Sequence, residues 1–401
     1  MPSNRPLTIL ALASYFKGER FLKQAKKRGA KVYLLTLQKL LGKEWPRDAV
    51  EDVFAQNDNP TLQQTINTVS YLNRSIRFDR IVALDDFDVE VGAALREHLR
   101  IPGMGDSQAR FFRDKLACRM RLRELGLLVP DFTPVFNNEV VAEWIAKVPA
   151  PWMLKPRSEA SATGISKVHT ADELWKLLES KGDARSQFHL ESFVPGDVYH
   201  VDALTSDGKV VFAEAAMCGE PPFSVAHGGG IFNTMTLERG TEEEKTLKAF
   251  NEKILTSLGY QYGASHVEFI KGRADGRFYL LETSARVGGA HIAEMHEYAT
   301  GINLWEEWAN LELDHAARAY TLPTRKAEYA GLLMTLAKQE HPDFSSYTDK
   351  EIVYRAPELS HAGLVVASPD RKRIAELMNS YKQRFVNDFM TVMPAASKPS
   401  N

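Results

Sequence analysis

The sequence predicts a multidomain protein that combines the α/β and α+β classes. Two features carry this prediction: strand-like and helix-like segments alternate from residue 7 to about residue 105, and hairpin patterns dominate from about residue 150 to residue 285. The 401 residues are enough for two to four packed units, and 44% of them are hydrophobic, as in ordinary globular proteins.

Composition and charge narrow the function classes. A net charge of −2 without a long basic run makes nucleic acid and anionic membranes poor partners. The two cysteines, Cys118 and Cys218, cannot build a disulfide framework or a zinc site on their own, so we expect a reducing, cytoplasmic location. The early apolar run LTILALA is too short for a signal-peptide core or a membrane span, and we interpret it as the first buried strand.

The first 105 residues predict a small parallel sheet with helices on its faces. LTILALA, AKVYLLTL and DRIVAL are strand-like, and GERFLKQAKKRG and LQQTINTVSYLNRS have helical spacing, which gives a β-α-β-α-β series. No GxGxxG follows the first strand, so a dinucleotide site is unsupported. Asp85, Asp86 and Asp88 follow the third strand, where such sheets place ligand loops; helix capping is the interpretation we favour.

The next segments predict a helix and a loop-bearing hairpin. One helix capped by Asp106 or Ser107 is expected to run to about Leu125, with Lys115 inside it as an ordinary solvated charge. PWMLKPRSEASATGISKVHT then predicts a strand, a small-residue loop and a second strand. The backbone N–H groups of SEASATG could surround a phosphate while Lys155 supplies charge, although a hairpin connection without a ligand is the more common case.

Antiparallel strands are expected in QFHLESFVPGDVYHVDALTSDGKVVFAEAA, with turns at Pro195-Gly196 and Asp207-Gly208. Residues 219–234 are rich in Gly and Pro and predict either a flexible connection or a lid. An amphipathic helix is predicted over residues 240–259, and two helices broken near Gly301 follow the next hairpin. Short strands and a final helix complete residues 325–394.

The stretch SHVEFIKGRADGRFYLLETSARVGG predicts a β-hairpin around which a site can form. Pairing its arms about Asp275 places Glu268 opposite Glu282, on one face of the sheet. Two such carboxylates repel each other, and a divalent cation between them removes the repulsion. Arg286, just beyond the second arm, suits an anion. The alternative is an exposed hairpin with two solvated glutamates.

The order of these motifs resembles the ATP-grasp superfamily. The resemblance covers about residues 1–315 and rests on Lys115 in RDKLACRMRLRELGLLVP, on MLKP with its small-residue loop, on LESFVPG, on HVEF and on LLETSARVGG. Within the superfamily, HVEF and ETSARVGG are most similar to the L-amino-acid ligases, the dipeptide-forming branch. HVEF with FYLLE also resembles biotin carboxylase, but no biotinyl partner domain is visible in the sequence.

The resemblance implies an N-terminal parallel α/β domain of the pre-ATP-grasp type over residues 1–105. A two-lobed ATP-grasp domain with antiparallel sheets follows: a small lobe, or lid, with its leading helix over 106–190, and a large lobe with the metal site over 191–315. Residues 316–401 are expected to form a C-terminal α/β segment packed on the large lobe.

Roles for single residues also come from the resemblance. Glu268 and Glu282 match the magnesium ligands, and Ser284 stands where the family often has a third ligand, Asn. Arg286 matches the arginine that binds the transferring phosphoryl group. The residues that match the ATP-binding positions are Lys115, Lys155, Ser161, Thr163, Gly164, Glu191, Phe193, Val194 and Ile270.

One position departs from the family pattern. Val198 replaces the glutamate that often binds the ribose hydroxyls, so we expect ribose binding from elsewhere, with His200 and Asp202 as nearby candidates. His227, just before three glycines, and His291 are candidates for the base that serves the acceptor amine, and a structural role for either histidine is an equal alternative.

The resemblance implies an ATP-dependent carboxylate–amine ligase that activates a carboxylate, expected to be an amino acid, as an acyl phosphate. ATP and Mg²⁺, which Mn²⁺ could replace, are the expected cofactors, and small-molecule carboxylates and amines the expected partners, with a homodimer common in the superfamily. Two alternatives stay open. One is a ligase with another nucleophile, such as bicarbonate or a thiol, and the other is a nucleotide-binding protein without turnover.

Overall fold

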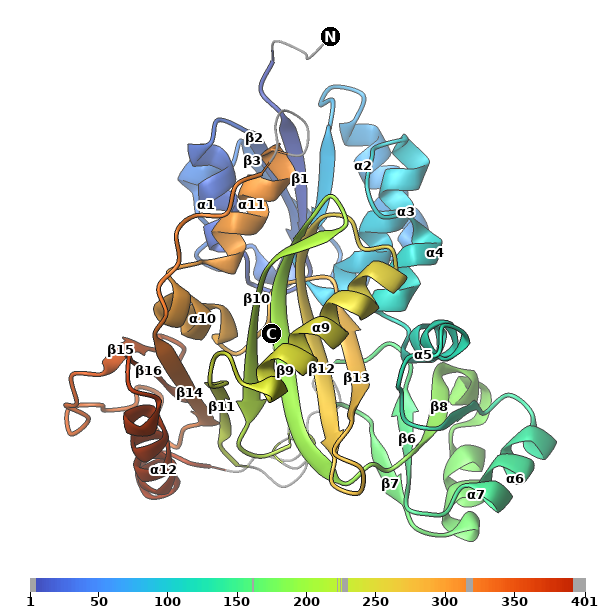
Figure 1. Cartoon of the computed structure of the whole chain (residues 1–401). Helices are drawn as coiled ribbons and strands as arrows, with labels where there is room; N and C mark the ends of the chain where they lie inside the picture. Colours follow the sequence, from blue (N-terminus) through green and yellow to red (C-terminus); the bar gives the residue numbers. More distant parts are fainter. Residues whose placement is uncertain are drawn as a thin grey trace.

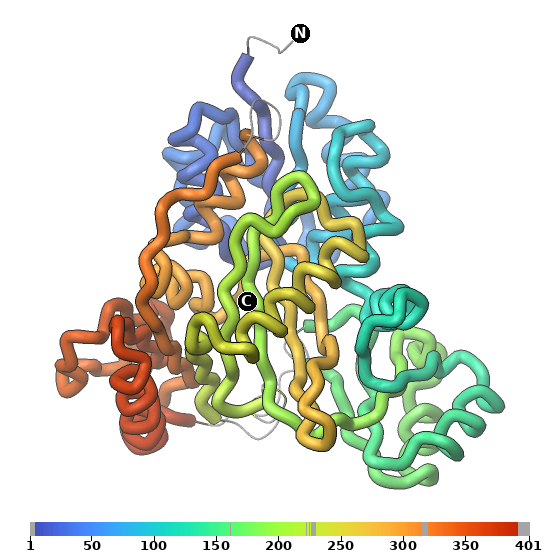
Figure 2. Tube along the Cα trace, viewed as in Figure 1, coloured from blue at the N-terminus to red at the C-terminus, as the bar shows by residue number. Residues whose placement is uncertain are grey.

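The structure is a computed structural model that describes residues 5–160, 162–221, 223, 225, 230–314 and 320–391. Within these ranges the strands form three sheets, one parallel and two antiparallel. The parallel sheet and its helices lie at the top of Figure 1, the smaller antiparallel sheet at the lower right, and the large antiparallel sheet runs through the middle to the lower left. The trace in Figure 2 shows the same arrangement.

The N-terminal unit confirms the predicted parallel α/β class. Its four-stranded sheet has the order β3-β2-β1-β4. Every residue of the central strand β1 is buried, as expected for a strand covered on both faces. The strands are β1 Thr8–Ala13, β2 Lys31–Leu37, β3 Asp52–Gln56 and β4 Arg80–Ala83, and the helices are α1 Glu19–Lys27, α2 Leu62–Leu72 and α3 Val89–Leu99.

Strand β3 was not predicted. It is an edge strand whose residues are all partly or fully exposed, so it lacks the apolar alternation by which strands are recognised. Helix α2, by contrast, begins where its sequence indicates, because Thr61 and Gln64 form a reciprocal capping box.

The prediction of one helix from residue 106 to about 125 is wrong. The segment forms α4 Asp106–Ala109, a 3₁₀ turn over Arg110–Phe112 and then α5 Lys115–Glu124. Helix α5 starts at Asp114, whose carboxylate accepts hydrogen bonds from the backbone N–H groups of Leu116 and Ala117. Lys115 is therefore the first residue of a helix rather than a residue in its middle.

The smaller antiparallel sheet has the order β5-β8-β6-β7 and lies beside α6 and α7 (Figure 1). Its core is a separate apolar cluster that includes Val141 of α6, Leu154 of β6 and Leu174 of α7. The elements are β5 Phe132–Pro134, α6 Asn138–Lys147, β6 Trp152–Pro156, β7 Ser166–Val168, α7 Ala171–Ser180 and β8 Phe188–Ser192.

The large antiparallel sheet has eight strands in the order β13-β12-β9-β10-β11-β14-β16-β15. The last three strands, β14, β15 and β16, thus extend the sheet that carries the β12–β13 hairpin. The strands are β9 Gly196–Ser206, β10 Lys209–Cys218, β11 Phe232–Thr236, β12 Gly263–Gly272, β13 Phe278–Ser284, β14 Tyr329–Leu336, β15 Ile352–Arg355 and β16 His361–Ser368. The helices that pack on it are α9 Glu242–Ser257, α10 Ile292–Thr300, α11 Leu304–Asp314 and α12 Arg371–Asp388.

Helix α11 packs against α1 and so joins the large sheet to the N-terminal unit. Phe21 of α1 meets Trp308 of α11 edge-on, with ring centroids 5.3 Å apart, in an apolar cluster that both units share. The boundaries of the expected domains stay a prediction, since a shared core does not define them.

The predicted turn at Asp207-Gly208 joins β9 to β10, with both residues at positive φ. Pro195-Gly196 is not a hairpin turn, however, because β8 and β9 belong to different sheets and the chain crosses between them here. A Cβ at Gly196 would lie 2.2 Å from the carbonyl oxygen of Lys271, so the crossing needs glycine. Of the predicted lid over residues 219–234, positions 222, 224 and 226–229 lie outside the described residues, and residues 232–234 belong to β11.

Candidate active site

A cavity of about 270 Å³ lies between the smaller sheet and the large sheet. It receives side chains from β6, β8, β9, β12, β13, the start of α5 and the loop after β6. Most of the predicted ATP-site residues line it: Lys115, Lys155, Thr163, Glu191, Phe193, Val194, Ile270, Glu268 and Glu282. The structure therefore gathers in one place residues that the sequence separates by up to 167 positions, as Lys115 and Glu282 are.

The two glutamates of the hairpin stand where the sequence predicted. Glu268 on β12 pairs directly with Glu282 on β13. The side chain of Glu268 is 30% exposed and that of Glu282 is 23% exposed. Burial would raise the pKa of Glu268, but the hydrogen bond and charge of His266 outweigh it and lower that pKa.

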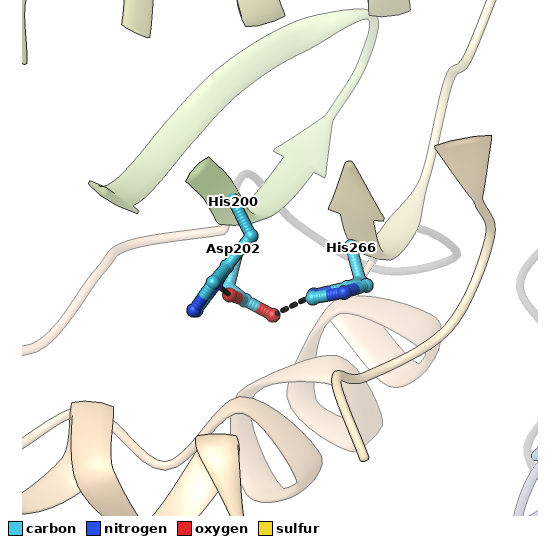
Figure 3. Close-up of side chains that lie close together, drawn as sticks. All are labelled: His200, Asp202 and His266. Carbon is cyan, nitrogen blue, oxygen red and sulfur yellow. Dashed lines mark hydrogen bonds and ion pairs between the residues drawn. The ribbon is translucent and has the colours of Figure 1, made fainter. Parts of the chain in front are cut away.

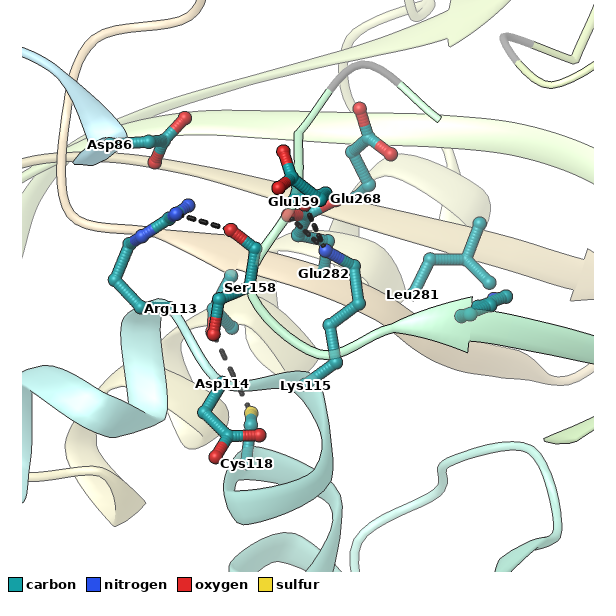
Figure 4. Close-up of polar contacts among 12 residues, drawn as sticks. Asp86, Arg113, Asp114, Lys115, Cys118, Ser158, Glu159, Glu268, Leu281 and Glu282 are labelled. Carbon is teal, nitrogen blue, oxygen red and sulfur yellow. Dashed lines mark hydrogen bonds and ion pairs between the residues drawn. The ribbon is translucent and has the colours of Figure 1, made fainter. Parts of the chain in front are cut away.

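Lys115 already holds one of these carboxylates. Its ammonium Nζ lies 2.8 Å from Oε1 of Glu282 and donates to the carbonyl oxygen of Glu159 at 2.6 Å (Figure 4). Asp114 caps α5 and so fixes where the helix begins. Its carboxylate is itself held in place by an ion pair with Arg157. The positive charge at this end of the cavity is thus positioned by the backbone of a helix N-terminus.

Lys155 belongs to a charge cluster around Glu191, which is buried, while the side chain of Lys155 is 11% exposed. The Glu191 carboxylate contacts Arg119, lies 2.6 Å from Nζ of Lys155 and lies 2.6 Å from Nε2 of His189. Burial would raise the pKa of Glu191, but Arg119 first, then Lys155 and His189, lower it well below its ordinary value. Burial likewise lowers the pKa of Lys155, against the opposing charge of Glu191.

Part of the cavity wall is apolar. Phe193, Val194, Val198, Ile270 and Leu281 contribute to it, which suits the flat face of an organic ring. The Nζ atom of Lys167 lies 3.7 Å from the ring centroid of Phe193. Lys167 could not be identified from the sequence, because its contact with Phe193 depends on how the strands pair and not on the spacing of residues along the chain.

The small-residue loop approaches the cavity through Ala162 and Thr163. Gly164 is at φ +71°, and a Cβ there would lie 2.9 Å from the ring of Pro156, so its role in the structure is to let the loop turn. Gly164 does not line the cavity, and Ser161 lies outside the described residues.

Arg286 does not line this cavity and is bound to the N-terminal unit instead. Its Nε and Nη2 atoms each lie 2.6 Å from Oδ2 of Asp86, and its Nη1 donates to the carbonyl of Val287 at 2.9 Å. Burial would raise the pKa of Asp86, but Arg286 and then Arg113 lower it to about 2. The partner of Arg286 in the structure is thus Asp86.

The three aspartates after β4 do not all cap a helix. Asp85 accepts from the N–H of Phe87 at 3.0 Å, as a cap does. Asp86 binds Arg286, and Asp88 accepts from the backbone and hydroxyl of Ser14. The capping prediction therefore holds for Asp85 alone.

His200 and Asp202 lie in a buried histidine cluster rather than at the cavity. Asp202 accepts from His200 at 2.7 Å and from His266 at 2.9 Å (Figure 3). It also accepts from His296 at 3.0 Å. Ligand atoms of His200, Asp202 and His266 lie within 4.8 Å of one another, but these hydrogen bonds account for their proximity. Neither His200 nor Asp202 lines the cavity, so the structure does not support ribose binding by them.

The same cluster extends to the paired glutamates. His266 pairs with Ser284 across the hairpin, and its Nε2 lies 3.5 Å from Oε1 of Glu268. Burial would lower the pKa of His266, but Asp202 and then Glu268 raise it to about 9. Ser284 is buried and lies on the same face as Glu282, two residues away.

The structure does not favour His291 as a base. It lies 3.0 Å from Glu358 and 3.5 Å from Glu294. Burial would lower its pKa, but these two carboxylates raise it to about 9, so the imidazole is charged at neutral pH. His227, the other candidate, lies outside the described residues.

No family model matches the chain. Its fold, with a cavity between a small and a large antiparallel sheet, is that of the ATP-grasp enzymes. Among solved structures, L-amino acid ligase from Bacillus licheniformis superposes with a TM-score of 0.75 at 18% identity, covering 97% of this chain and 99% of that one. A biotin carboxylase domain from Hydrogenobacter thermophilus, solved with MgADP, gives a TM-score of 0.72 at 15% identity over 94% and 90% of the two chains.

The curated relatives are ligases. L-arginine-specific L-amino acid ligase from Bacillus subtilis is 24% identical over 59% of this chain and 58% of its own length. D-alanine–D-alanine ligase from Actinobacillus pleuropneumoniae serotype 5b is 32% identical over 48% of this chain and 64% of its own length. The match thus spans less than two thirds of either relative. In the described part of the chain, no helix has both the length and the apolar character that crossing a bilayer requires.

Proposed function

We propose that the protein is an ATP-dependent carboxylate–amine ligase that activates a carboxylate as an acyl phosphate and joins it to an amine, releasing ADP and phosphate. One observation carries this proposal. A single cavity is lined both by apolar side chains and by the opposed pair Glu268 and Glu282 with Lys115. A nucleotide needs this combination, because its base is flat and apolar while its phosphates require a cation.

Magnesium fits the donors that are present. Glu268 and Glu282 offer hard oxygen ligands from one face of the sheet, and the hydroxyl of Ser284 lies on that face too. Lys115 holds a positive charge 2.8 Å from Glu282, so the position suits a cation. Bound magnesium would neutralise phosphate charge at this place.

The protein's own groups do the remaining work in this proposal. Lys115 and Lys155 bind phosphate oxygens, which spreads the triphosphate charge over two ammonium groups. The residues around Thr163 cover the phosphates and exclude water, which would otherwise hydrolyse an acyl phosphate. Arg286 binds the transferring phosphoryl group once it is released from, or shared with, Asp86, since a guanidinium can serve two anions.

Amino acids are the substrates we propose for both reactants. The relatives' names give L-arginine and D-alanine, so the first panel should contain free amino acids of both configurations. The fold alone does not separate this function from carboxylation, because a biotin carboxylase domain superposes almost as well.

A screen for ADP release tests the proposal. The purified chain with ATP and Mg²⁺ is assayed against all pairs of amino acids, and against bicarbonate with biotin as the rival pair. Release that needs two amino acids supports the proposal, and release with bicarbonate and biotin alone contradicts it. Hydroxylamine, in place of the amine, should then give a hydroxamate, because it captures activated carboxylates.

A further inference from the structure

A second cavity, of about 250 Å³, lies between the N-terminal sheet and the large sheet. It shares no lining residue with the candidate active site. Its walls are β4, part of α3, the loop at Pro102-Gly103, the segment Tyr260–Tyr262 and the C-terminal half of α11. Nothing in the proposed ligase chemistry uses this space.

One wall carries a buried guanidinium with a free side. Arg96 is 8% exposed; its Nε donates to the carbonyl of Met104 at 2.9 Å and its Nη1 to that of Ile81 at 2.8 Å. Its Nη2 has no hydrogen-bond partner among the described residues. Gly103 allows the close packing, because a Cβ there would lie 2.6 Å from Cδ of Arg96. The guanidinium of Arg96 is therefore held in one orientation, while its Nη2 stays available to a ligand.

The wall on α11 carries a carboxylate. Oε1 of Glu312 accepts from the indole N–H of Trp308 at 3.1 Å, and Glu312 forms no ion pair within the described part of the chain. Burial raises the pKa of Glu312, against the opposing charges of Arg80 and Arg96. Burial lowers the pKa of Arg96, against the opposing charge of Glu312. The two charges affect each other across the cavity without touching.

Unpaired charges at low exposure are costly, and proteins rarely keep them without a partner. Here the cost is also visible at Arg80, whose Nε is buried without a hydrogen-bond acceptor in the described residues. The apolar part of the lining includes Val82, Ala83 and Val89. A ligand that satisfies both walls must carry an anion and a cation at its ends and an aliphatic group between them.

We propose that this cavity binds a free α-amino acid as its zwitterion, with the carboxylate on Arg96, the ammonium on Glu312 and a small aliphatic side chain against β4. The volume is sufficient. At about 30 Å³ for each water in the liquid, the space equals roughly eight waters, which is more than an amino acid of valine size fills. The site does not depend on the ligase proposal, since it needs neither nucleotide nor turnover.

Ala285 lines this cavity and stands between Ser284, at the end of β13, and Arg286. A bound amino acid would therefore contact the segment that holds both residues.

Calorimetric titration of the full chain without nucleotide tests the proposal, with L-valine as the probe. Glu312→Gln keeps an acceptor for Trp308 and removes the charge, so L-valine should bind about tenfold more weakly or worse. Met104→Trp adds bulk to a partly exposed wall position without touching the carbonyl that Arg96 uses, and it should weaken binding too. Glu306→Gln is the matched control: it makes the same change on the same helix, where the carboxylate faces Arg20 outside the cavity.

Two analogues separate the ligand classes. 2-Hydroxy-3-methylbutanoate keeps the carboxylate and lacks the ammonium, and 2-methylpropylamine keeps only the ammonium; both should bind much more weakly than L-valine. Equal binding of the hydroxy acid would make this an anion site and overturn the proposal. So would the absence of L-valine binding, or an affinity that Glu312→Gln and Met104→Trp leave unchanged, which would place the ligand elsewhere. Failure of the ligase proposal would show separately, as no ADP release with any amino-acid pair.

Discussion

Glu282 is the residue on which the candidate chemistry depends most. We expect Glu282→Gln to lower kcat on the order of 10²-fold or more, because a neutral amide cannot replace a charged ligand at a site built to bind cations. The melting temperature should change little, since the side chain is partly exposed and supports no core. Magnesium-dependent ADP release and a thermal melt on one preparation make the comparison. Near-normal turnover would remove Glu282 from the site.

His291 gives a prediction in pH. Its pKa is raised from 6.5 to about 9 by Glu294 and Glu358, so the imidazolium stabilises the folded state. A raised pKa means that this contribution is complete below about pH 6.5 and disappears as the pH rises through about 9. The free energy of unfolding of wild type should therefore exceed that of His291→Gln at pH 6, and the difference should shrink by pH 9.5. A difference that does not depend on pH would show that the ion pairs are not its source.

Local sequence was enough to predict the pairing of Glu268 with Glu282. The turn chemistry of KGRADG and the alternation of its two arms located the hairpin, but a register shift between Glu268 and Phe269 changes the pairing nearer the turn, where Phe269 pairs with Leu280 rather than with Leu281. The partner of Arg286 could not be predicted in the same way, because Asp86 is 200 residues away and no periodicity links the two. The histidines around Asp202 present the same difficulty: His296 approaches from a helix 94 residues further along.

At the scale of elements, the start of α5 controls where Lys115 points. Asp114→Ala removes the cap and the Arg157 contact, which should cost about 0.5–2 kcal/mol of stability. The KM for ATP should also rise, because the first residue of the frayed helix is Lys115. Stability comes from denaturant unfolding and KM from the ADP assay.

Asn137→Ala supplies the matched control. Asn137 caps α6 through the N–H of Val140, at a helix whose residues do not line the cavity. It should lose similar stability and keep its KM for ATP. Equal KM values for the two variants would mean that the cap at Asp114 is structural only.

The break in the helix predicted over residues 106–125 was missed for a physical reason. Residues 106–125 are all compatible with one helix. A new helix, α5, begins after Asp114 because the side chain of Asp114 caps it and also pairs with Arg157, which follows strand β6. Strand β3 was missed because an edge strand with exposed residues carries little apolar pattern. Helices with a complete cap in their own sequence, such as α2 and its Thr61, were predicted closely.

At the scale of the whole molecule, the Asp86–Arg286 ion pair joins the segment after β4 of the N-terminal sheet to the segment after β13 of the large sheet. Asp86→Asn leaves a buried guanidinium without its counter-charge, so we expect a loss of about 3–5 kcal/mol of stability. Because the pKa of Asp86 is lowered to about 2 from 3.8, the wild-type contribution should be present above pH 4 and disappear as the pH falls towards 2. Unfolding measured from pH 7 to pH 2 should show the two proteins converging. If the stabilities of the two proteins instead stay equally far apart from pH 7 to pH 2, the ionised Asp86 is not the source of the difference.

The contact of Lys115 with Glu282 carries a thermodynamic consequence. One ammonium cannot at once neutralise Glu282 and a nucleotide phosphate at full strength, so a divalent ion that takes over Glu282 releases Lys115 for the nucleotide. Linkage then requires that the nucleotide raise the affinity for the ion by the same factor. The empty protein would bind either one poorly and both together well. In a cell, where most of the nucleotide is bound to magnesium, such a protein would bind the complex tightly and would bind free nucleotide or free magnesium only weakly.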